Sequence, residues 1–151
     1  MDVGCYCVSG SRLLAGEPER VYGEQEVNES GVDVRFAGTM RFPGGVIAQF
    51  DSGLVLPDRD ELEAIGDEGS LFLDDPWHGN EPVIELRRED GAKTIRIERQ
   101  DSYRLELENM SDAIRGEAPP LLGRQDAVAQ ARAIEALYRS AELRVPISLA
   151  H

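Results

Sequence analysis

The sequence has few of the residues that commonly build metal and redox sites. Its 151 residues include two histidines and two cysteines. His78 and His151 have no ligand-like spacing, so no metal site is expected. Cys5 and Cys7 stand two apart in an expected helix, where they point to different faces and cannot readily form a disulfide. We therefore expect buried thiols in a reducing compartment such as the cytoplasm.

Basic residues are also scarce relative to acidic ones. Sixteen Lys and Arg oppose 29 Asp and Glu, which gives a formal net charge of −13. A field of that sign repels nucleic-acid phosphates and anionic membrane surfaces. No apolar run approaches the ~20 residues of a membrane span. Neither nucleic acid nor membrane is therefore an expected partner, and the absence of G-x-G-x-x-G and P-loop motifs leaves no phosphate-binding loop.

The sequence does contain clear changes of hydrophobic period. A helix is predicted over residues 2–15, with apolar positions at Val3, Tyr6, Cys7, Leu13 and Leu14. Alternating segments then predict strands over 20–26, 32–42, 46–51, 59–65, 70–74, 83–88 and 93–99. Two further helices are predicted over 103–115 and 126–142, with inward stripes at Tyr103, Leu107, Met110 and Ile114 and at Ala127, Ala131, Ile134, Tyr138 and Ala141. A last short strand is possible over residues 145–149.

This order of elements predicts an α+β fold. We expect a mainly antiparallel open sheet of about six or seven strands, with helices on one face, in a single domain over residues 1–151. Gly38 marks a bulge or a close approach within its strand. The second sheet face carries Asp33, Arg35, Thr39, Arg41, Ile47 and Gln49. Because the helices are too few to cover both faces, we expect part of this face to pack against a second copy, giving a homo-oligomer.

The most suggestive reactive pair is Asp2 and Tyr6, at the start of the first expected helix. A spacing of four places two side chains on one helix face, and Gly4 between them would let a ligand approach closely. An acid and a phenol at a helix N-terminus can act as a proton-transfer unit. The alternative from these residues alone is structural, with Asp2 as the N-cap and Tyr6 packed with its hydroxyl at the surface.

Other reactive groups have plainer interpretations. Trp77 and His78 lie in a loop over residues 75–82, where they could line a pocket next to substrate or cofactor; a Trp that anchors the loop is the alternative. Arg12 is expected to form a structural ion pair rather than a substrate contact. The neighbouring carboxylates fit a solvated surface better than a catalytic pair: Asp58, Asp60 and Glu61, and Asp74 and Asp75.

Several stretches in order carry a family resemblance. Residues 2–21, D-V-G-C-Y-C-V-S-G-S-R-L-L-A-G-E-P-E-R-V, resemble the segment that opens the C-terminal domain in the glucose–fructose oxidoreductase / inositol dehydrogenase / rhizopine-catabolism (Gfo/Idh/MocA) family. Residues 42–53, 60–74 and 101–116 are similar to that domain's sheet hairpin, next strand pair and penultimate helix. The resemblance therefore covers nearly the whole chain.

The resemblance implies an NAD(P)-dependent oxidoreductase that acts on a sugar or diol. The family motif Asp-x-Gly-x-His or Asp-x-Gly-x-Tyr matches Asp2, Gly4 and Tyr6. By this match Tyr6 would donate or accept the proton at the substrate oxygen, Asp2 would orient substrate or catalytic groups, and Gly4 would lie beside the substrate or cofactor. Tyrosine at this position is similar to the xylose dehydrogenase and dihydrodiol dehydrogenase branch.

Two other family features have no match in the chain: the dinucleotide loop and a Glu-Lys-Pro catalytic lysine. They belong to the family's N-terminal Rossmann domain, and a helix that starts at residue 2 fits a start inside a longer gene. We therefore expect NAD or NADP to be bound mainly by that domain, with no cofactor and no dehydrogenase activity in this chain alone. The alternative is a non-catalytic sheet domain for oligomerisation or small-ligand binding.

Overall fold

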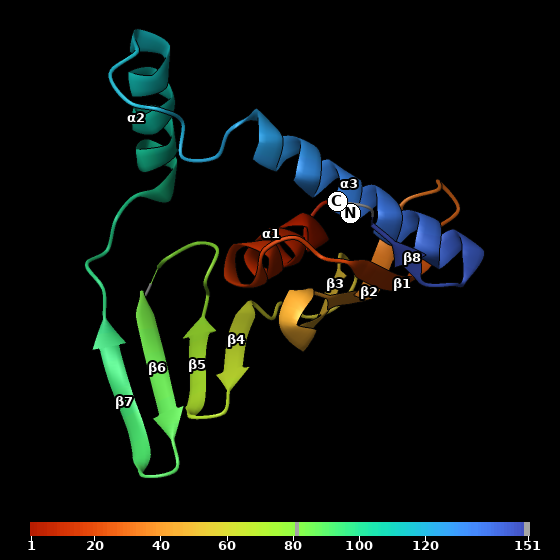
Figure 1. Cartoon of the computed structure of the whole chain (residues 1–151), viewed down its shortest axis with the longest axis horizontal. Helices are drawn as coiled ribbons and strands as arrows, with labels where there is room; N and C mark the ends of the chain where they lie inside the picture. The colour runs from red at the N-terminus through yellow and green to blue at the C-terminus, as the bar shows by residue number, and fades with distance from the viewer. Residues whose placement is uncertain (81, 150–151) are drawn as a thin grey trace. The chain divides into compact units, whose positions relative to one another are not determined.

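The computed structural model describes residues 1–80 and 82–149, which form two compact units (Figure 1). Unit 1 contains the described residues of 1–57 and 122–149, and unit 2 contains those of 58–121. Glu81, in the loop predicted over residues 75–82, lies outside the described ranges. Within these ranges, no helix is both long enough and apolar enough to cross a membrane.

Unit 1 is a four-stranded antiparallel sheet in the order β3-β2-β1-β8, with helices packed on it. Helix α3 packs on β1, and helix α1 packs on β3 and α3 (Figure 1). The elements of this unit are α1 (Gly4–Ala15), β1 (Arg20–Val27), β2 (Asp33–Arg41), a 3-10 turn (Pro43–Gly45), β3 (Ile47–Gly53), α3 (Arg124–Leu143) and β8 (Ile147–Ser148).

The core of unit 1 forms where α3 rests on a pair of glycines. Gly23 of β1 and Gly38 of β2 are directly paired across the sheet. A Cβ at Gly38 would lie 2.4 Å from the Phe50 ring and 3.2 Å from Leu137 Cδ2. Leu137 is fully buried there. Gly38 therefore provides a close approach, which is one of the two roles predicted for it.

Ser140 of α3 links this helix to the sheet through hydrogen bonds. Its buried hydroxyl accepts a hydrogen bond from the Gly23 amide at 3.1 Å and donates to the Val145 carbonyl at 2.6 Å. Buried backbone groups need such partners, since an unpaired one costs about 1–3 kcal/mol. The hydroxyl thus satisfies a strand amide beyond the end of the short β1–β8 ladder.

Unit 2 is a second four-stranded antiparallel sheet, in the order β4-β5-β6-β7, followed by one helix. A hairpin joins β6 to β7 as predicted, but its two turn residues are Glu89 and Asp90, one position earlier than the predicted Asp90-Gly91, because Gly91 already pairs with Arg88 in the ladder. None of the described residues of unit 2 is fully buried. Its elements are β4 (Glu61–Gly66), β5 (Gly69–Asp74), β6 (Val83–Arg88), β7 (Gly91–Arg96) and α2 (Ser102–Arg115).

The α+β class and the antiparallel pairing are confirmed, and the strand count differs. There are eight strands in two sheets, where the sequence predicted six or seven in one. The ladder stops after β3, which ends at Gly53, and Pro57 follows four residues later. Because proline has no amide hydrogen, it cannot donate to a sheet ladder. This break separates the pairing of β1–β3 from that of β4–β7.

Helix α1 buries the opposite face from the one predicted. The apolar side chains expected to point inward are exposed: Val3, Tyr6, Leu13 and Leu14. Gly4, Val8 and Arg12, each four residues apart, are buried instead. The prediction failed because it ranked positions by hydrophobicity, whereas this face packs through a glycine and through an arginine whose charge is paired.

The predicted stripe of α2 is wholly exposed, at Tyr103, Leu107, Met110 and Ile114. In α3, Ile134, Tyr138 and Ala141 pack against the core as predicted. The fully buried positions of α3 lie beside that stripe, at Ala133, Ala136, Leu137 and Ser140, whereas Ala127 and Ala131 are exposed. Small alanines do not fix a helix face, because either orientation can accommodate them.

Asp33 does not belong to the second sheet face on which the sequence placed it. Its carboxylate accepts a hydrogen bond from the Tyr138 hydroxyl of α3 at 3.0 Å and pairs with the Met1 amino group at 2.8 Å. The β1–β2 register shifts at Glu26/Val27, next to the pair that Asp33 makes. Such an irregularity moves the following side chain to the other face.

Candidate functional site

Tyr6 and Asp2 lie at the N-terminal end of α1 in unit 1. The helix begins at Gly4, its N-cap is Val3, and no side chain caps it. Asp2 therefore is not the N-cap, and because it precedes the helix, the predicted helical spacing does not apply to the pair. Tyr6 is 51% exposed in the first turn, and its amide donates to the Val3 carbonyl at 3.2 Å. The phenol is thus accessible on a helix whose opposite face is buried.

Gly4 is required by the packing of this first turn. A Cβ at Gly4 would lie 2.6 Å from Met1 Cγ and 2.6 Å from Ser52 Oγ of β3. The close approach predicted at this glycine therefore comes from the protein's own side chains. A larger residue here would therefore require the Met1 or Ser52 side chain, or the first turn of α1, to shift.

Arg12 holds α1 against α3. Its guanidinium donates to Glu17 at 3.0 and 2.7 Å, to Asp126 Oδ1 at 2.9 Å and to Gln130 Oε1 at 2.8 Å. The hydrogen bond to Glu17 raises the pKa of Arg12 above its ordinary value, with desolvation acting against it and Asp126 adding to it. The structural ion pair predicted for Arg12 is confirmed, and a buried arginine fixes the face on which α1 packs.

The Trp77–His78 loop of unit 2 is organised by Asp75. The carboxylate of Asp75 accepts from the His78 amide at 3.2 Å, and it also lies 2.7 Å from His78 Nδ1. The Asn80 side chain donates to the second oxygen at 2.8 Å. Asp75 has a positive φ of 54°, which asparagine and aspartate tolerate better than bulkier residues. The loop is therefore a built turn, with Trp77 half-buried within it.

Two opposing effects act on the carboxyl of Asp75. Desolvation works to raise its pKa, but the hydrogen bonds from Asn80 and His78 outweigh it and lower the pKa below the ordinary value. Asp60 adds a second carboxylate 3.5 Å from His78 Nδ1. These three residues are the group in the described chain with a metal-like arrangement of donor atoms. The oxygens of Asp75 already accept hydrogen bonds from the loop, so the arrangement is accounted for without a metal.

A cleft of ≈ 470 Å³ adjoins this loop in unit 2. It is lined by polar side chains, namely His78, Asn80, Arg99, Gln100, Asp101, Ser102 and Tyr103. Asp101 is already engaged, because its carboxylate caps α2 by accepting from the Arg104 amide at 3.1 Å. Of the two loop residues predicted to line a pocket, His78 borders this cleft and Trp77 is not among the residues that line it.

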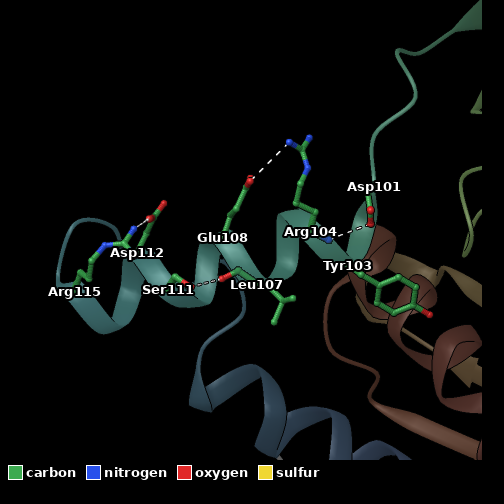
Figure 2. Close-up of a pocket in the computed structure, with 8 residues that line it drawn as sticks. All are labelled: Asp101, Tyr103, Arg104, Leu107, Glu108, Ser111, Asp112 and Arg115. Carbon is green, nitrogen blue, oxygen red and sulfur yellow. Dashed lines mark hydrogen bonds and ion pairs between the residues drawn. The ribbon is translucent and has the colours of Figure 1, made fainter.

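A second cleft, of ≈ 480 Å³, runs along α2 itself. Figure 2 shows that its polar side chains pair with one another along the helix: Arg104 with Glu108 at 3.8 Å, and Arg115 with Asp112. The Ser111 hydroxyl donates to the Leu107 carbonyl at 2.7 Å. Most of the polar groups here are satisfied within one helix, so this cleft offers weaker recognition chemistry than the first.

The predicted site residues are divided between the two units. Asp2, Gly4 and Tyr6 belong to unit 1, and Trp77 and His78 belong to unit 2. Sequence reasoning missed Gln130 of α3, which bonds to Arg12 and to the Cys5 carbonyl of α1, and the organising role of Asp75. An aspartate followed closely by Pro, His, Gly and Asn is a turn signal that could have pointed to Asp75. Nothing local to the sequence marks Gln130.

Comparison with known proteins gives a consistent set of relatives. Residues 1–72 match the family model described as GFO/IDH/MocA C-terminal domain. The chain is 32% identical over 155 aligned residues to D-xylose 1-dehydrogenase (NADP(+)) 2 of Haloferax volcanii, covering 99% of this chain and 47% of that protein. It is 25% identical over 92 residues to mouse trans-1,2-dihydrobenzene-1,2-diol dehydrogenase, covering 60% of this chain and 28% of that enzyme.

The fold has solved counterparts among oxidoreductases. The aldose-aldose oxidoreductase of Caulobacter crescentus, solved with glycerol, superposes with a TM-score of 0.86 at 21% identity, covering 97% of this chain and 46% of that one. The chain thus spans about half the length of the relatives that it matches along its full extent. The family match over residues 1–72, the identity to xylose dehydrogenase and the shared fold agree, and the chain is similar to the C-terminal domain of Gfo/Idh/MocA oxidoreductases.

Proposed function

We propose that this chain is the substrate-side domain of an NAD(P)-dependent oxidoreductase that transfers a hydride between a nicotinamide cofactor and a sugar or diol. The observation that carries the proposal is the accessible phenol of Tyr6 on a helix turn whose opposite face is locked against β3 and α3. A reactive group held on a rigid element is what catalysis requires. Relatives that act on xylose and on a dihydrodiol support the substrate class.

Tyr6 performs the proton transfer in this proposal. When bound, NAD or NADP accepts or supplies the hydride. Oxidation of a hydroxyl-bearing carbon also releases the hydroxyl proton, which Tyr6 Oη accepts as a phenolate; in the reverse direction the Tyr6 phenol returns it. Tyr6 lies in the first turn of α1. Asp2, exposed just before this turn, orients a substrate hydroxyl by accepting its hydrogen bond.

The nicotinamide cofactor is held mainly outside this chain. The sequence has no glycine-rich phosphate-binding loop. The residues present thus fit the substrate end of the reaction and not the dinucleotide phosphates. It follows that the chain by itself has no dehydrogenase activity and works together with a dinucleotide-binding domain.

His78 and Trp77 border the substrate or cofactor in this proposal. When His78 is neutral, donation from Nδ1 to Asp75 leaves Nε2 as an acceptor for a substrate hydroxyl. Trp77 offers an aromatic surface against which the C–H groups of a sugar can pack. Both residues belong to a turn that the hydrogen bonds of Asp75 organise.

A second role, self-association, is favoured by the exposed apolar surface. The described residues of unit 2 include no fully buried side chain, yet they include exposed apolar residues such as Ile65, Leu107 and Ile114. In unit 1 the outer sheet face presents Arg41, Ile47 and Gln49, all exposed. We propose that a second copy packs against the sheet face, in a cytoplasmic homo-oligomer. Sedimentation that shows a strict monomer at high concentration would contradict this part.

Two assays separate the enzyme from a non-catalytic sheet domain. The chain is mixed with NAD⁺ or NADP⁺ and a panel of aldoses and diols, and reduced cofactor is followed by its absorbance. The same assay is repeated after the chain is joined to a dinucleotide-binding domain of the same family. Activity of the joined protein together with inactivity of the isolated chain supports the proposal. Turnover by the isolated chain would contradict the divided site, and inactivity of both would favour the binding domain.

A further inference from the structure

Gln130 of α3 bonds directly from another helix to the backbone beside Tyr6. Its Nε2 donates to the Cys5 carbonyl oxygen at 2.8 Å, and its Oε1 accepts from Arg12 Nη1 at 2.8 Å. The Cys5 carbonyl belongs to the peptide bond that immediately precedes Tyr6. A side chain that is 118 residues away from Arg12 in sequence thus links the last turn of α1 to its first turn.

Arg12 determines which way the Gln130 amide points. A guanidinium has donors and no acceptor, so the atom that faces it must be the amide oxygen. The amide nitrogen is then left to face the Cys5 carbonyl. Arg12 itself is fixed by Glu17 and Asp126, at 2.7 and 2.9 Å. The orientation of the hydrogen bond to Cys5 is therefore set by paired charges and not by the amide itself.

The first turn of α1 depends on such tertiary contacts. It has no side-chain N-cap, and its N-cap position is a valine. A helix end without a cap frays more easily, and a missing cap costs about 1 kcal/mol. Locally, the Cys5 thiol donates to the Asp2 carbonyl at 2.8 Å. Gln130 supplies the bond from a neighbouring helix that holds this turn in place.

We propose that Gln130 is a positioning residue, which fixes Tyr6 through the Cys5 carbonyl in the orientation that Arg12 selects. The inference rests on the proposed function, because it assigns a purpose to the placement of Tyr6. The hydrogen bonds that run from Arg12 through Gln130 to the Cys5 carbonyl, here called the relay, are a property of this chain. They can be tested without turnover.

The substitution Gln130→Glu isolates the effect. A carboxylate keeps the shape and still accepts from Arg12, but it cannot donate to the Cys5 carbonyl. Gln125→Glu, on the exposed surface of the same helix, is the matched control with the same change of charge. In the 151-residue chain we expect Gln130→Glu to speed amide exchange in the first turn of α1 about tenfold, which corresponds to one lost hydrogen bond. The ring ¹³C resonance of Tyr6 shifts as well, and the control leaves both unchanged.

Three results would overturn the relay. They are unchanged exchange in the first turn, an unmoved Tyr6 resonance, or faster exchange spread evenly over α1, α3 and the sheet, which would mark a general loss of stability. The denaturation midpoint is measured alongside, and if Gln130→Glu does not fold, Gln130→Met is judged by the same criteria.

Turnover separates a failure of the relay from a failure of the proposed function. In the protein joined to a dinucleotide-binding domain, Gln130→Glu should lower kcat about tenfold with KM within twofold. Normal kcat in Gln130→Glu, with Tyr6→Phe inactive, would reject the relay alone. Normal turnover in Tyr6→Phe would reject the proposed function, whatever the exchange data show for Gln130.

Discussion

Units 1 and 2 have sheets of equal strand number but are stabilised differently. The fully buried hydrophobic side chains of the described residues all lie in unit 1. By sequence, unit 2 has 18 acidic and 8 basic residues, a net charge of −10, whereas unit 1 has 11 and 8, a net charge of −3. Unit 1 therefore relies on a core, and unit 2 relies on its ladder and on surface pairs such as Arg87 over the Phe72 ring at 4.0 Å.

The two units therefore give different surroundings to the proposed site residues that they contain. Tyr6 belongs to the unit with a packed core, where local opening requires breaking buried contacts. His78 belongs to the unit whose described residues include no fully buried side chain, so its loop has less to hold it beyond Asp75. The following predictions test the contrast, from the largest effect to the smallest.

Truncation of a leucine should separate the two units most strongly. The Leu137 side chain lies above the glycine pair in unit 1, and 0% of its surface is exposed. Leu137→Ala therefore leaves a cavity at this position. We expect a loss of about 3 kcal/mol of unfolding free energy, within the range for buried leucines. Leu107→Ala in α2, where the side chain is 68% exposed, should change stability by less than about 0.5 kcal/mol. Equal losses in urea denaturation would contradict the contrast.

Arginine substitutions give the second test. Arg12→Met removes the buried guanidinium and leaves Glu17, Asp126 and Gln130 without their shared partner. We expect a loss of about 2 kcal/mol, moderated because both carboxylates are partly solvated. Arg104→Met on α2 breaks an exposed pair and should cost less than about 0.5 kcal/mol. Thermal unfolding of the two variants side by side gives the comparison, and a smaller effect at Arg12 would argue against its anchoring role.

Salt should stabilise unit 2 more than unit 1. A net charge of −10 on a unit without a packed core creates self-repulsion that counterions screen. Between about 0.1 and 1 M salt, where the screening length falls from ~10 to ~3 Å, we expect amide exchange in β4–β7 to slow by about threefold or more. Exchange in β1 and β2 should change less. Equal slowing in both sheets would show that charge does not distinguish them.

Acid should loosen the Asp75 turn before it affects the core of unit 1. Hydrogen bonds from Asn80 and His78 hold the pKa of Asp75 below its unfolded value, although desolvation opposes them. A lowered pKa in the folded state means that this stabilisation is present above the unfolded pKa and is lost as the pH falls through the folded one. The amide resonances of His78 and Asn80 should therefore move at a pH below 3.8. Movement of both signals well above that pH would contradict the assignment.

The sequence predicted the ladder better than the packing. Apolar and polar residues alternate with a period of two along a strand, and this alternation is visible in the local sequence. The ranges of β1 to β7 therefore fall close to the predicted ones. Gly38 was predicted as a close-approach point or a bulge, because glycine within a strand has few other uses. The strand pattern does not predict the break of the sheet after β3, because Pro57 lies outside the alternating segments.

Helix faces and the relay could not be predicted from composition. In α1 the buried face includes Arg12, whose burial depends on Glu17 and on Asp126 of α3. A partner so distant in sequence leaves no local signal. The same holds for Gln130, an unremarkable helix residue whose role arises when α3 packs against α1. For Tyr6, family resemblance supplied the candidate role, and the structure supplied its exposure.

The central claim is that Tyr6 transfers the proton, and Tyr6→Phe tests it most directly. The measurement is kcat/KM for NAD(P)⁺-dependent oxidation of an aldose by the chain joined to a dinucleotide-binding domain. Tyr22→Phe, which removes a phenol bonded to Glu24 on β1, is the matched control. We predict a fall of at least about 100-fold for Tyr6→Phe, the usual range for a lost general acid–base group, and a change within twofold for Tyr22→Phe. Near-normal kcat/KM in Tyr6→Phe would contradict the account.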